Sequence, residues 1–256
     1  MLYAITRQIS PRFAECELTH LDRQPIDLDL ARAQHHEYEA TLRALGGEVI
    51  SLPAEPDLPD SVFVEDVALV FDEVAVITRP GADSRKPETE SIARALKPYR
   101  TLRAIEAPGT IDGGDVLRVG RMVYVGLSSR SNRSGVEQLQ KILAPYGYTV
   151  KGVEVTGCLH LKSAVTQVSD DTLLINPAWV ERSIFGTMKF IEVDAGEPAA
   201  ANALWINDTV LYPSSFPKTR RRLEEAGLRL KIVDATEVAK AEGAVTCCSL
   251  IFQVSD

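Results

Sequence analysis

The sequence predicts an α/β fold in which about five similar units surround a common centre. Four stretches share one plan, in which an apolar strand, a short polar turn and a second apolar strand follow one another: residues 61–81, 109–130, 158–178 and 199–215. This plan is typical of a β-hairpin. A helical segment and a further short strand follow most of the hairpins. A repeated hairpin–helix–strand unit favours radial closure, which protects the edges of small sheets.

A fifth, partial copy lies at the C-terminal end of the sequence. Residues 242–254 contain only an opening strand, and the N-terminal segment 1–10 is predicted to be a strand without a hairpin partner. Pairing of these two segments closes the predicted ring. The alternative arrangement is a single mixed sheet covered by two layers of helices.

The elements between the hairpins follow from residue spacing. Apolar residues recur at helical intervals, and the pattern ends near Pro or Gly, in residues 29–47, 83–99, 130–148 and 216–227. Further short strands are expected at residues 48–53, 100–108, 149–155, 189–193 and 228–234.

Composition and charge limit the classes of function. The 256 residues carry a net charge of −8 and are 45% hydrophobic, which fits one globular domain spanning residues 1–256. The acidic balance argues against a nucleic-acid partner and is compatible with a small cation. The sequence has neither an apolar stretch of the ~20 residues that a membrane helix needs nor the layout of a signal peptide. We therefore expect a cytoplasmic protein with no membrane partner.

The four cysteines are expected to be free. Cys16, Cys158, Cys247 and Cys248 form no CxxC pair, so a structural zinc site is not predicted. In a strand, adjacent side chains point to opposite faces, so only one of the twin cysteines need be reactive. We predict that Cys247 belongs to a site and that Cys248 points into the packing.

Chemically reactive residues recur where the first strand of each unit begins. In a ring of equivalent units these positions converge near the central axis: Glu65, Asp66, Asp112, Asp115, His160, Asn202 and Cys247. A thiol, an imidazole and several carboxylates at one place are the components of a cysteine nucleophile with its acid–base partner. Taken singly, each has a simpler interpretation, because a cysteine in an apolar strand is usually packing and a histidine between leucines can belong to the core.

Five motifs at these positions together resemble one known family. They are "FVEDVALV", "TIDGGDVLRVG", "VGLSSRSN", "CLHLKSAV" and "EGAVTCCSLIF", they cover nearly the whole chain, and their order resembles that in the dimethylargininases of the guanidino-group-modifying (pentein) superfamily. The resemblance implies a five-bladed α/β propeller of pseudo-symmetric ββαβ repeats around a central channel. It also implies hydrolysis of Nω-methylated L-arginines to L-citrulline and methylamine or dimethylamine, with no cofactor and no metal.

The resemblance also implies roles for single residues. Cys247 would be the nucleophile, His160 the general acid and base, and Asp112, where some members have Glu, would orient His160. The implied substrate-binding residues are Leu18 in a mobile loop, the guanidinium-binding carboxylates Asp60, Glu65 and Asp66, the carboxylate-binding Arg85 and Arg130, and Ala241. The partner would be a small-molecule substrate, and the protein a monomer or a homodimer.

Four other functions stay open at this point. Arginine deiminases and amidinotransferases share the cysteine chemistry but are longer chains. A non-catalytic binder of arginine-like ligands is disfavoured because Cys247, His160 and Asp112 are all present. A Cys–His–Asp acyl hydrolase has no use for the additional acids Asp60, Glu65 and Asp66.

Overall fold

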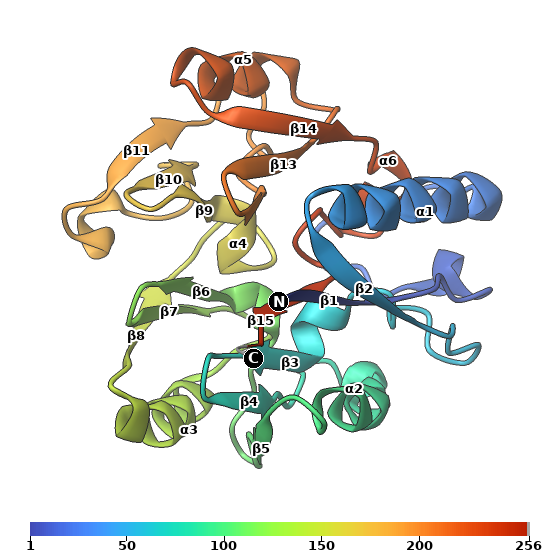
Figure 1. The fold of residues 1–256 in the computed structure, drawn as a ribbon, viewed down its shortest axis with the longest axis vertical. Helices are drawn as coiled ribbons and strands as arrows, with labels where there is room; N and C mark the ends of the chain where they lie inside the picture. The colour runs from blue at the N-terminus through green and yellow to red at the C-terminus, as the bar shows by residue number, and fades with distance from the viewer. Residues whose placement is uncertain (255–256) are drawn as a thin grey trace.

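Five three-stranded sheets surround a central channel, with the longer helices at the periphery (Figure 1). The computed structural model describes residues 1–254. The strand orders are β15-β1-β2, β3-β4-β5, β6-β7-β8, β9-β10-β11 and β12-β13-β14. In every sheet the first two strands are antiparallel and the third is parallel to the second. This arrangement confirms the predicted ring of five units and excludes the single mixed sheet.

The strands are short, and each ends close to the boundary that its apolar pattern predicts. They are β1 (Leu2–Arg7), β2 (Gly47–Leu52), β3 (Ala68–Val70), β4 (Val74–Ile77), β5 (Thr101–Ala104), β6 (Val116–Val119), β7 (Met122–Leu127), β8 (Thr149–Glu154), β9 (Val165–Ser169), β10 (Thr172–Ile175), β11 (Lys189–Glu192), β12 (Leu204–Ile206), β13 (Thr209–Pro213), β14 (Arg229–Val233) and β15 (Leu250–Gln253).

Helices connect the second and third strands of four sheets, as the spacing predicts. The α-helices are α1 (Leu28–Ala44), α2 (Thr89–Leu96), α3 (Arg133–Leu143), α4 (Leu161–Ala164), α5 (Pro217–Glu225) and α6 (Thr236–Ala239). The 3₁₀ turns are η1 (Phe13–Glu15), η2 (Val64–Val67), η3 (Asp83–Glu88), η4 (Gly113–Asp115), η5 (Ala144–Tyr146) and η6 (Arg182–Phe185). The predicted helix 83–99 is divided into η3 and α2, with Pro87 as the penultimate residue of η3.

The two ends of the chain close the ring, as predicted. β1 pairs antiparallel with β15, from Leu2 opposite Gln253 to Ile5 opposite Leu250, and parallel with β2. Figure 1 shows β1 and β15 beside one another near the centre. The last sheet therefore contains the first and the last strand of the chain, so it links elements that lie far apart in sequence.

Each outer helix packs an apolar face against its sheet. In α3, Leu139 and Leu143 are fully buried and contact Val123 and Val125 of β7 within one cluster. The i, i+4 spacing places both leucines on the same face of the helix. Burial of such a side chain contributes roughly 2 kcal/mol. These contacts fix the position of the sheets around the channel.

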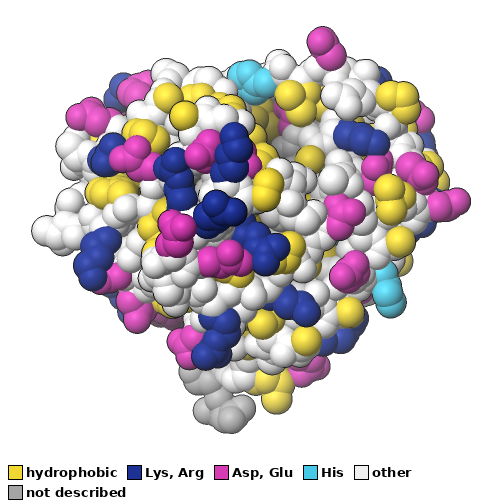
Figure 2. Space-filling view, turned by 90° about the horizontal axis from the view of Figure 1, so that it is seen from above, with side chains coloured by type: hydrophobic (Ala, Val, Ile, Leu, Met, Phe, Trp, Pro, Cys, Tyr) yellow, Lys and Arg dark blue, Asp and Glu magenta, His cyan; other side chains and the backbone are white. Residues whose placement is uncertain are grey.

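The surface carries both signs of charge. On the α5 side of the molecule, Lys and Arg side chains lie among Asp and Glu (Figure 2). Two ion pairs there join Arg220 Nε to Glu224 Oε1 at 2.8 Å and Arg222 Nη2 to Asp194 Oδ2 at 2.9 Å. Across residues 1–254, every helix is too short or too polar to cross a membrane.

Candidate active site

A small buried cavity lies where the turns before the first strands converge. Its volume is about 20 Å³. Seven of the ten residues that the sequence assigns to the site line it: Asp60, Asp66, Arg85, Arg130, His160, Ala241 and Cys247. Asp112 lies one hydrogen bond away, next to His160. Leu18 and Glu65 contribute no side chain to its wall.

The site residues stand on single helical turns at the entrances to the strands. Asp66 lies in η2, Asp112 immediately precedes η4, and His160 immediately precedes α4. Glycines allow these turns to meet, because a Cβ at Gly113 would lie 1.9 Å from the Glu65 carbonyl oxygen. The "IDGGD" motif is therefore a close-packing device as well as a source of carboxylates.

The twin cysteines lie in a turn, which corrects their predicted placement in a strand. Residues 245–248 form a turn, and β15 begins only at Leu250. Cys247 lines the cavity, whereas the Cys248 thiol lies 3.7 Å from the Ala244 carbonyl oxygen and is buried away from the cavity wall. The two side chains still point in different directions, as predicted, but a turn and not a strand separates them. The cysteines lie before the strand because, as in the other units, a turn precedes the first strand.

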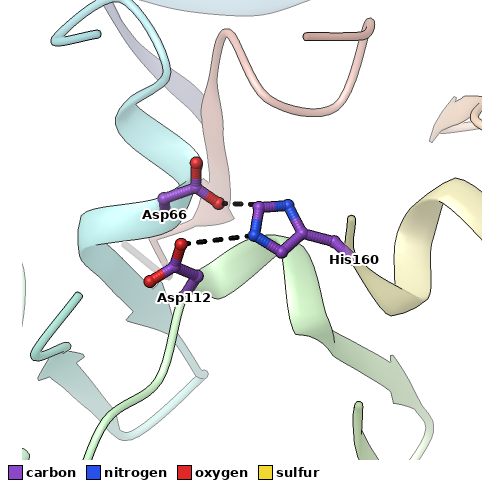
Figure 3. Close-up of side chains that lie close together, drawn as sticks. All are labelled: Asp66, Asp112 and His160. Atoms are coloured by element: carbon purple, nitrogen blue, oxygen red, sulfur yellow. Dashed lines mark hydrogen bonds and ion pairs between the residues drawn. The ribbon is translucent and has the colours of Figure 1, made fainter. Parts of the chain in front are cut away.

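His160 is held between two carboxylates (Figure 3). Its Nε2 lies 3.2 Å from Asp112 Oδ2, and its Nδ1 lies 4.0 Å from Asp66 Oδ1. Burial lowers the pKa of the imidazole, but the charge of Asp66 and the hydrogen bond with Asp112 outweigh burial and raise the pKa of His160 to about 9. His160 is therefore a cationic acid near neutral pH.

The carboxylates that face His160 are themselves anchored. Asp112 Oδ1 accepts a hydrogen bond from the Gly81 backbone N–H at 2.9 Å, and the Asp112 N–H donates to Ser131 Oγ at 3.0 Å. Asp115 Oδ1 accepts the Leu161 N–H at 3.0 Å, which fixes the backbone immediately after His160. The imidazole and its partner consequently have one defined orientation.

Cys247 has the surroundings of a protonated thiol. Its side chain is buried, and burial raises the pKa of Cys247, with the negative charges of Glu65 and Asp66 raising that pKa further. Attack on an electrophile needs the thiolate. A cation next to the sulfur would therefore activate this cysteine.

Asp66 is paired with a buried arginine. Arg85 Nη1 donates to Asp66 Oδ2 at 2.5 Å, and the rest of the Arg85 guanidinium binds both carboxylate oxygens of Glu88. Burial raises the pKa of Asp66, but Arg85 and His160 outweigh it and hold that pKa below its usual value. Arg85 thus binds two carboxylates of the protein itself, and its binding of a substrate carboxylate stays a prediction.

The loop that contains Leu18 covers the cavity through its backbone. The Glu17 N–H donates to both oxygens of Asp60, at 3.2 and 3.1 Å, and Arg130 Nη2 donates to Thr19 Oγ1 at 3.0 Å. The Leu18 side chain itself is half-buried against the neighbouring apolar cluster. Two predicted substrate-binding residues, Asp60 and Arg130, are therefore occupied by loop residues 17 and 19.

The Glu65 carboxylate lies outside the cavity that it was expected to line. It binds Lys162 Nζ at 2.6 Å and accepts a hydrogen bond from Thr246 Oγ1 at 2.8 Å. We predicted that Glu65 contacts the guanidinium of a substrate. The position of its carboxylate outside the cavity does not support that prediction.

Sequence reasoning missed three groups at the site. Glu88 binds Arg85, Lys162 binds Glu65, and the Glu242 carboxylate accepts backbone N–H groups of residues 19–21. A signal existed for Glu88, because an Arg and a Glu three residues apart on a helical turn are neighbours. The Glu242 contact joins segments more than two hundred residues apart, and local spacing does not reveal it.

Asp66, Asp112 and His160 also have the spacing of a metal-binding group. Their potential ligand atoms lie within 4.8 Å of one another. The hydrogen bonds favour a different use, because Arg85 already binds Asp66 and the Gly81 N–H already binds Asp112. The positive charge of Arg85 opposes a second cation at this place.

Comparison with known proteins agrees with this geometry. A family model described as N,N dimethylarginine dimethylhydrolase, eukaryotic, matches residues 19–183. An N(G),N(G)-dimethylarginine dimethylaminohydrolase of Streptomyces coelicolor is 41% identical over 249 residues, which cover 96% of this chain and 95% of that protein. The enzyme of the same name from Pseudomonas aeruginosa is 37% identical over 228 residues, which cover 88% of this chain and 90% of that protein.

Solved structures lead to the same family. A cysteine-to-serine mutant of the Pseudomonas aeruginosa protein complexed with citrulline superposes with a TM-score of 0.93 at 35% identity, and the match covers 98% of both chains. A histidine-to-glycine variant of dimethylarginine dimethylaminohydrolase, as an adduct with S-methyl-L-thiocitrulline, gives a TM-score of 0.92 at 35% identity and covers 98% of this chain and 100% of that chain. The predicted five-bladed α/β propeller is thereby confirmed, and the chain belongs to the dimethylarginine dimethylaminohydrolase family.

Proposed function

We propose that this protein hydrolyses the methylated guanidino group of Nω-methylated L-arginines, giving L-citrulline and methylamine or dimethylamine. Family membership supports this reaction, as do relatives solved with citrulline and with an S-methyl-L-thiocitrulline adduct. The observation in this chain that carries the proposal is one cavity that Cys247 and His160 share, with Asp112 hydrogen-bonded to the imidazole.

Carboxylates select the cationic end of the substrate. A guanidinium is planar and presents a fork of N–H donors, which carboxylates bind in pairs. Asp66 and Asp60 line the cavity in which Cys247 lies, so they can hold the central carbon of the guanidinium within reach of the sulfur. Arg130 lines the same cavity and would bind the α-carboxylate.

The substrate itself activates the nucleophile. The thiol of Cys247 is protonated in the free protein because of burial and nearby carboxylates. A guanidinium brought next to it favours the thiolate by charge. The thiolate then attacks the guanidinium carbon and forms a tetrahedral adduct with a new C–S bond.

His160 serves both halves of the reaction. Its imidazolium donates a proton to the methylated nitrogen, the C–N bond breaks, and the amine leaves an S-alkylthiouronium on Cys247. The neutral imidazole then removes a proton from a water molecule that attacks the same carbon. Cleavage of the C–S bond releases citrulline and restores the thiolate. Asp112 holds the imidazole in one orientation during both steps.

The loop over the cavity must move when the substrate binds. A cavity of about 20 Å³ holds no more than a water molecule. The loop contacts of Glu17 and Thr19 occupy Asp60 and Arg130, and the guanidinium and the α-carboxylate of the substrate have the charges to replace them. Because an arginine within a protein has no free α-carboxylate for Arg130, we expect a preference for free methylarginine.

We propose a monomer or a homodimer that acts on a small-molecule substrate. The nucleophile must stay reduced, which favours a cytoplasmic location.

Citrulline formation by the purified protein tests the proposal. Asymmetric dimethylarginine, monomethylarginine and arginine are compared side by side with a metal chelator present, and the Cys247→Ser variant serves as the control. We expect turnover of the methylated substrates, little turnover of arginine and no effect of the chelator. Turnover of arginine alone would indicate a deiminase, and no citrulline from any substrate would refute the proposed reaction.

A further inference from the structure

A second cavity lies on the other side of the turn that carries the nucleophile. Its volume is about 510 Å³, and its wall includes Glu65, Lys162 and Thr246. None of these three side chains lines the small cavity that contains Cys247. Because Thr246 and Cys247 are consecutive, neighbouring residues of one turn face the two cavities.

Glu65 holds this turn from behind through two hydrogen bonds. Its carboxylate oxygen Oε2 accepts the Thr246 hydroxyl at 2.8 Å. Its backbone N–H donates to the Cys247 carbonyl oxygen at 3.1 Å. Asn202 fixes the same turn from another unit, because its Oδ1 accepts the Thr246 N–H at 3.1 Å. The backbone of the nucleophile is therefore bound by residues of two other units.

Lys162 forms an ion pair with Glu65 and so offsets the negative charge of Glu65 near the nucleophile's turn. Lys162 Nζ lies 2.6 Å from Glu65 Oε1 and 3.2 Å from the Gly113 carbonyl oxygen. The two side chains are only 17% and 10% exposed, so solvent screens their charges weakly. Lys162 offsets part of the charge of Glu65, which still raises the pKa of the Cys247 thiol with Lys162 in place. Without Lys162, a buried carboxylate would face a group that must itself become an anion.

We propose that Glu65 and Lys162 are positioning residues for Cys247, with Glu65 fixing the turn and Lys162 offsetting the charge of Glu65 so that the thiolate can form. The proposal rests on the proposed function only in taking Cys247 as the nucleophile. It gives Glu65 a role on the rear side of the site, in place of direct contact with the substrate.

Other ionisable groups also face the thiol, and all the variants compared in the test share them in the same form. They are the carboxylates Glu17, Asp60, Asp66 and Glu242, the cationic groups Arg85, Arg130 and His160, the buried Tyr38 hydroxyl and residue 248, whose thiol is replaced by serine in every variant. Substitutions confined to Glu65 and Lys162 therefore change one pair of charges against a fixed background.

The test is the pH dependence of Cys247 alkylation by iodoacetamide, in which the thiolate forms a C–S bond and iodide leaves. The measurement is made in a Cys248→Ser background, so that Cys247 is the one thiol in the tryptic peptide 241–256, and the labelled peptide is quantified by mass spectrometry. Lys162→Met should move the midpoint of the profile about one pH unit higher, and Glu65→Gln about one pH unit lower. The double variant should return close to the starting value.

Controls separate charge from damage to the fold. Lys162→Arg keeps the charge and should keep the midpoint, and Lys189→Met removes a lysine from an exposed ion pair with Asp171 and should have no effect. A change in access to the sulfur alters the rate at every pH and leaves the midpoint where it was. Shifts of the same sign in the two single variants, or no shift in either, would overturn the proposal.

Alkylation of Cys247 needs no turnover of methylarginine. The proposed hydrolase function and the proposed role of Glu65 and Lys162 can therefore be refuted independently. A protein that forms no citrulline but shows the opposite shifts would refute the proposed function and keep the charge pair. A protein that forms citrulline but shows no opposite shifts would support the proposed function and refute the role of Glu65 and Lys162.

Discussion

His160 Nε2 lies 3.2 Å from Asp112 Oδ2, and this contact joins the second and third units of the ring at the candidate site. Burial would make the imidazole neutral, yet the surrounding carboxylates raise the pKa of His160 to about 9. The histidine is consequently ready to donate a proton to a leaving amine at neutral pH. The same pairing fixes which ring nitrogen faces the reaction.

Replacing Asp112 tests this pairing. Asp112→Asn removes a negative charge and the hydrogen bond to a carboxylate, so the pKa of His160 should fall. We expect kcat to decrease on the order of 100-fold and the basic limb of the kcat profile to move to lower pH. Steady-state kinetics between pH 6 and 10 measure both effects. Loss of activity with an unchanged profile would mean that Asp112 acts through the fold alone.

The twin cysteines should differ in function. Cys247→Ser should lower kcat at least about 1000-fold, because an alcohol in this site is a far weaker nucleophile than a thiolate. Cys248→Ser should keep most of the activity, because the Cys248 side chain does not line the cavity. Citrulline assays of the two variants compare them directly. Equal losses in both would contradict the assignment of Cys247.

The raised pKa of His160 also predicts a change of stability with pH. The folded protein binds this proton more tightly than the unfolded chain does, so the stabilisation is complete below pH 6.5 and is lost as pH rises through about 9. The difference corresponds to about 3 kcal/mol. Denaturant unfolding of the wild type and of His160→Gln at pH 6 and pH 9.5 measures it. An equal stability difference at both pH values would contradict a raised pKa.

Arg130 should act on substrate binding more than on chemistry. Arg130→Lys keeps the charge but loses the fork that binds a carboxylate. We expect KM to rise about tenfold with little change in kcat. A decarboxylated methylguanidine is the matched control, since wild type and variant should treat it alike. An equal effect on both substrates would remove Arg130 from carboxylate recognition.

The overall ring could be predicted because its units repeat in the sequence. Hairpin patterns and helical periodicity are local signals, and the unpaired strands at residues 1–10 and 242–254 indicate closure. The prediction went wrong where a tertiary contact replaces a local one. Cys247 and Cys248 look like strand residues because an apolar run follows them, but the turn is held by Glu65 and Asn202 from other units.

The site could be predicted as a set of residues more readily than as a set of contacts. Cys247, His160 and Asp112 recur at equivalent positions of the units, and the structure brings them together. The partners of Arg85 and Glu65 do not occupy equivalent positions of the units, so the repeat does not predict them. The i, i+3 spacing indicates the pairing of Arg85 with Glu88, but the pairing of Glu65 with Lys162 joins residues that lie far apart in sequence, which local spacing does not reveal.

A covalent adduct on Cys247 tests the central claim most directly. The His160→Gly variant and the wild type are treated with S-methyl-L-thiocitrulline, quenched in acid, and the C-terminal tryptic peptide is examined by tandem mass spectrometry. We expect the variant to accumulate the mass of the ligand less methanethiol on Cys247, because it lacks the base that activates water, and the wild type to release citrulline. An adduct on Cys248, or no adduct in a folded variant, would contradict the account.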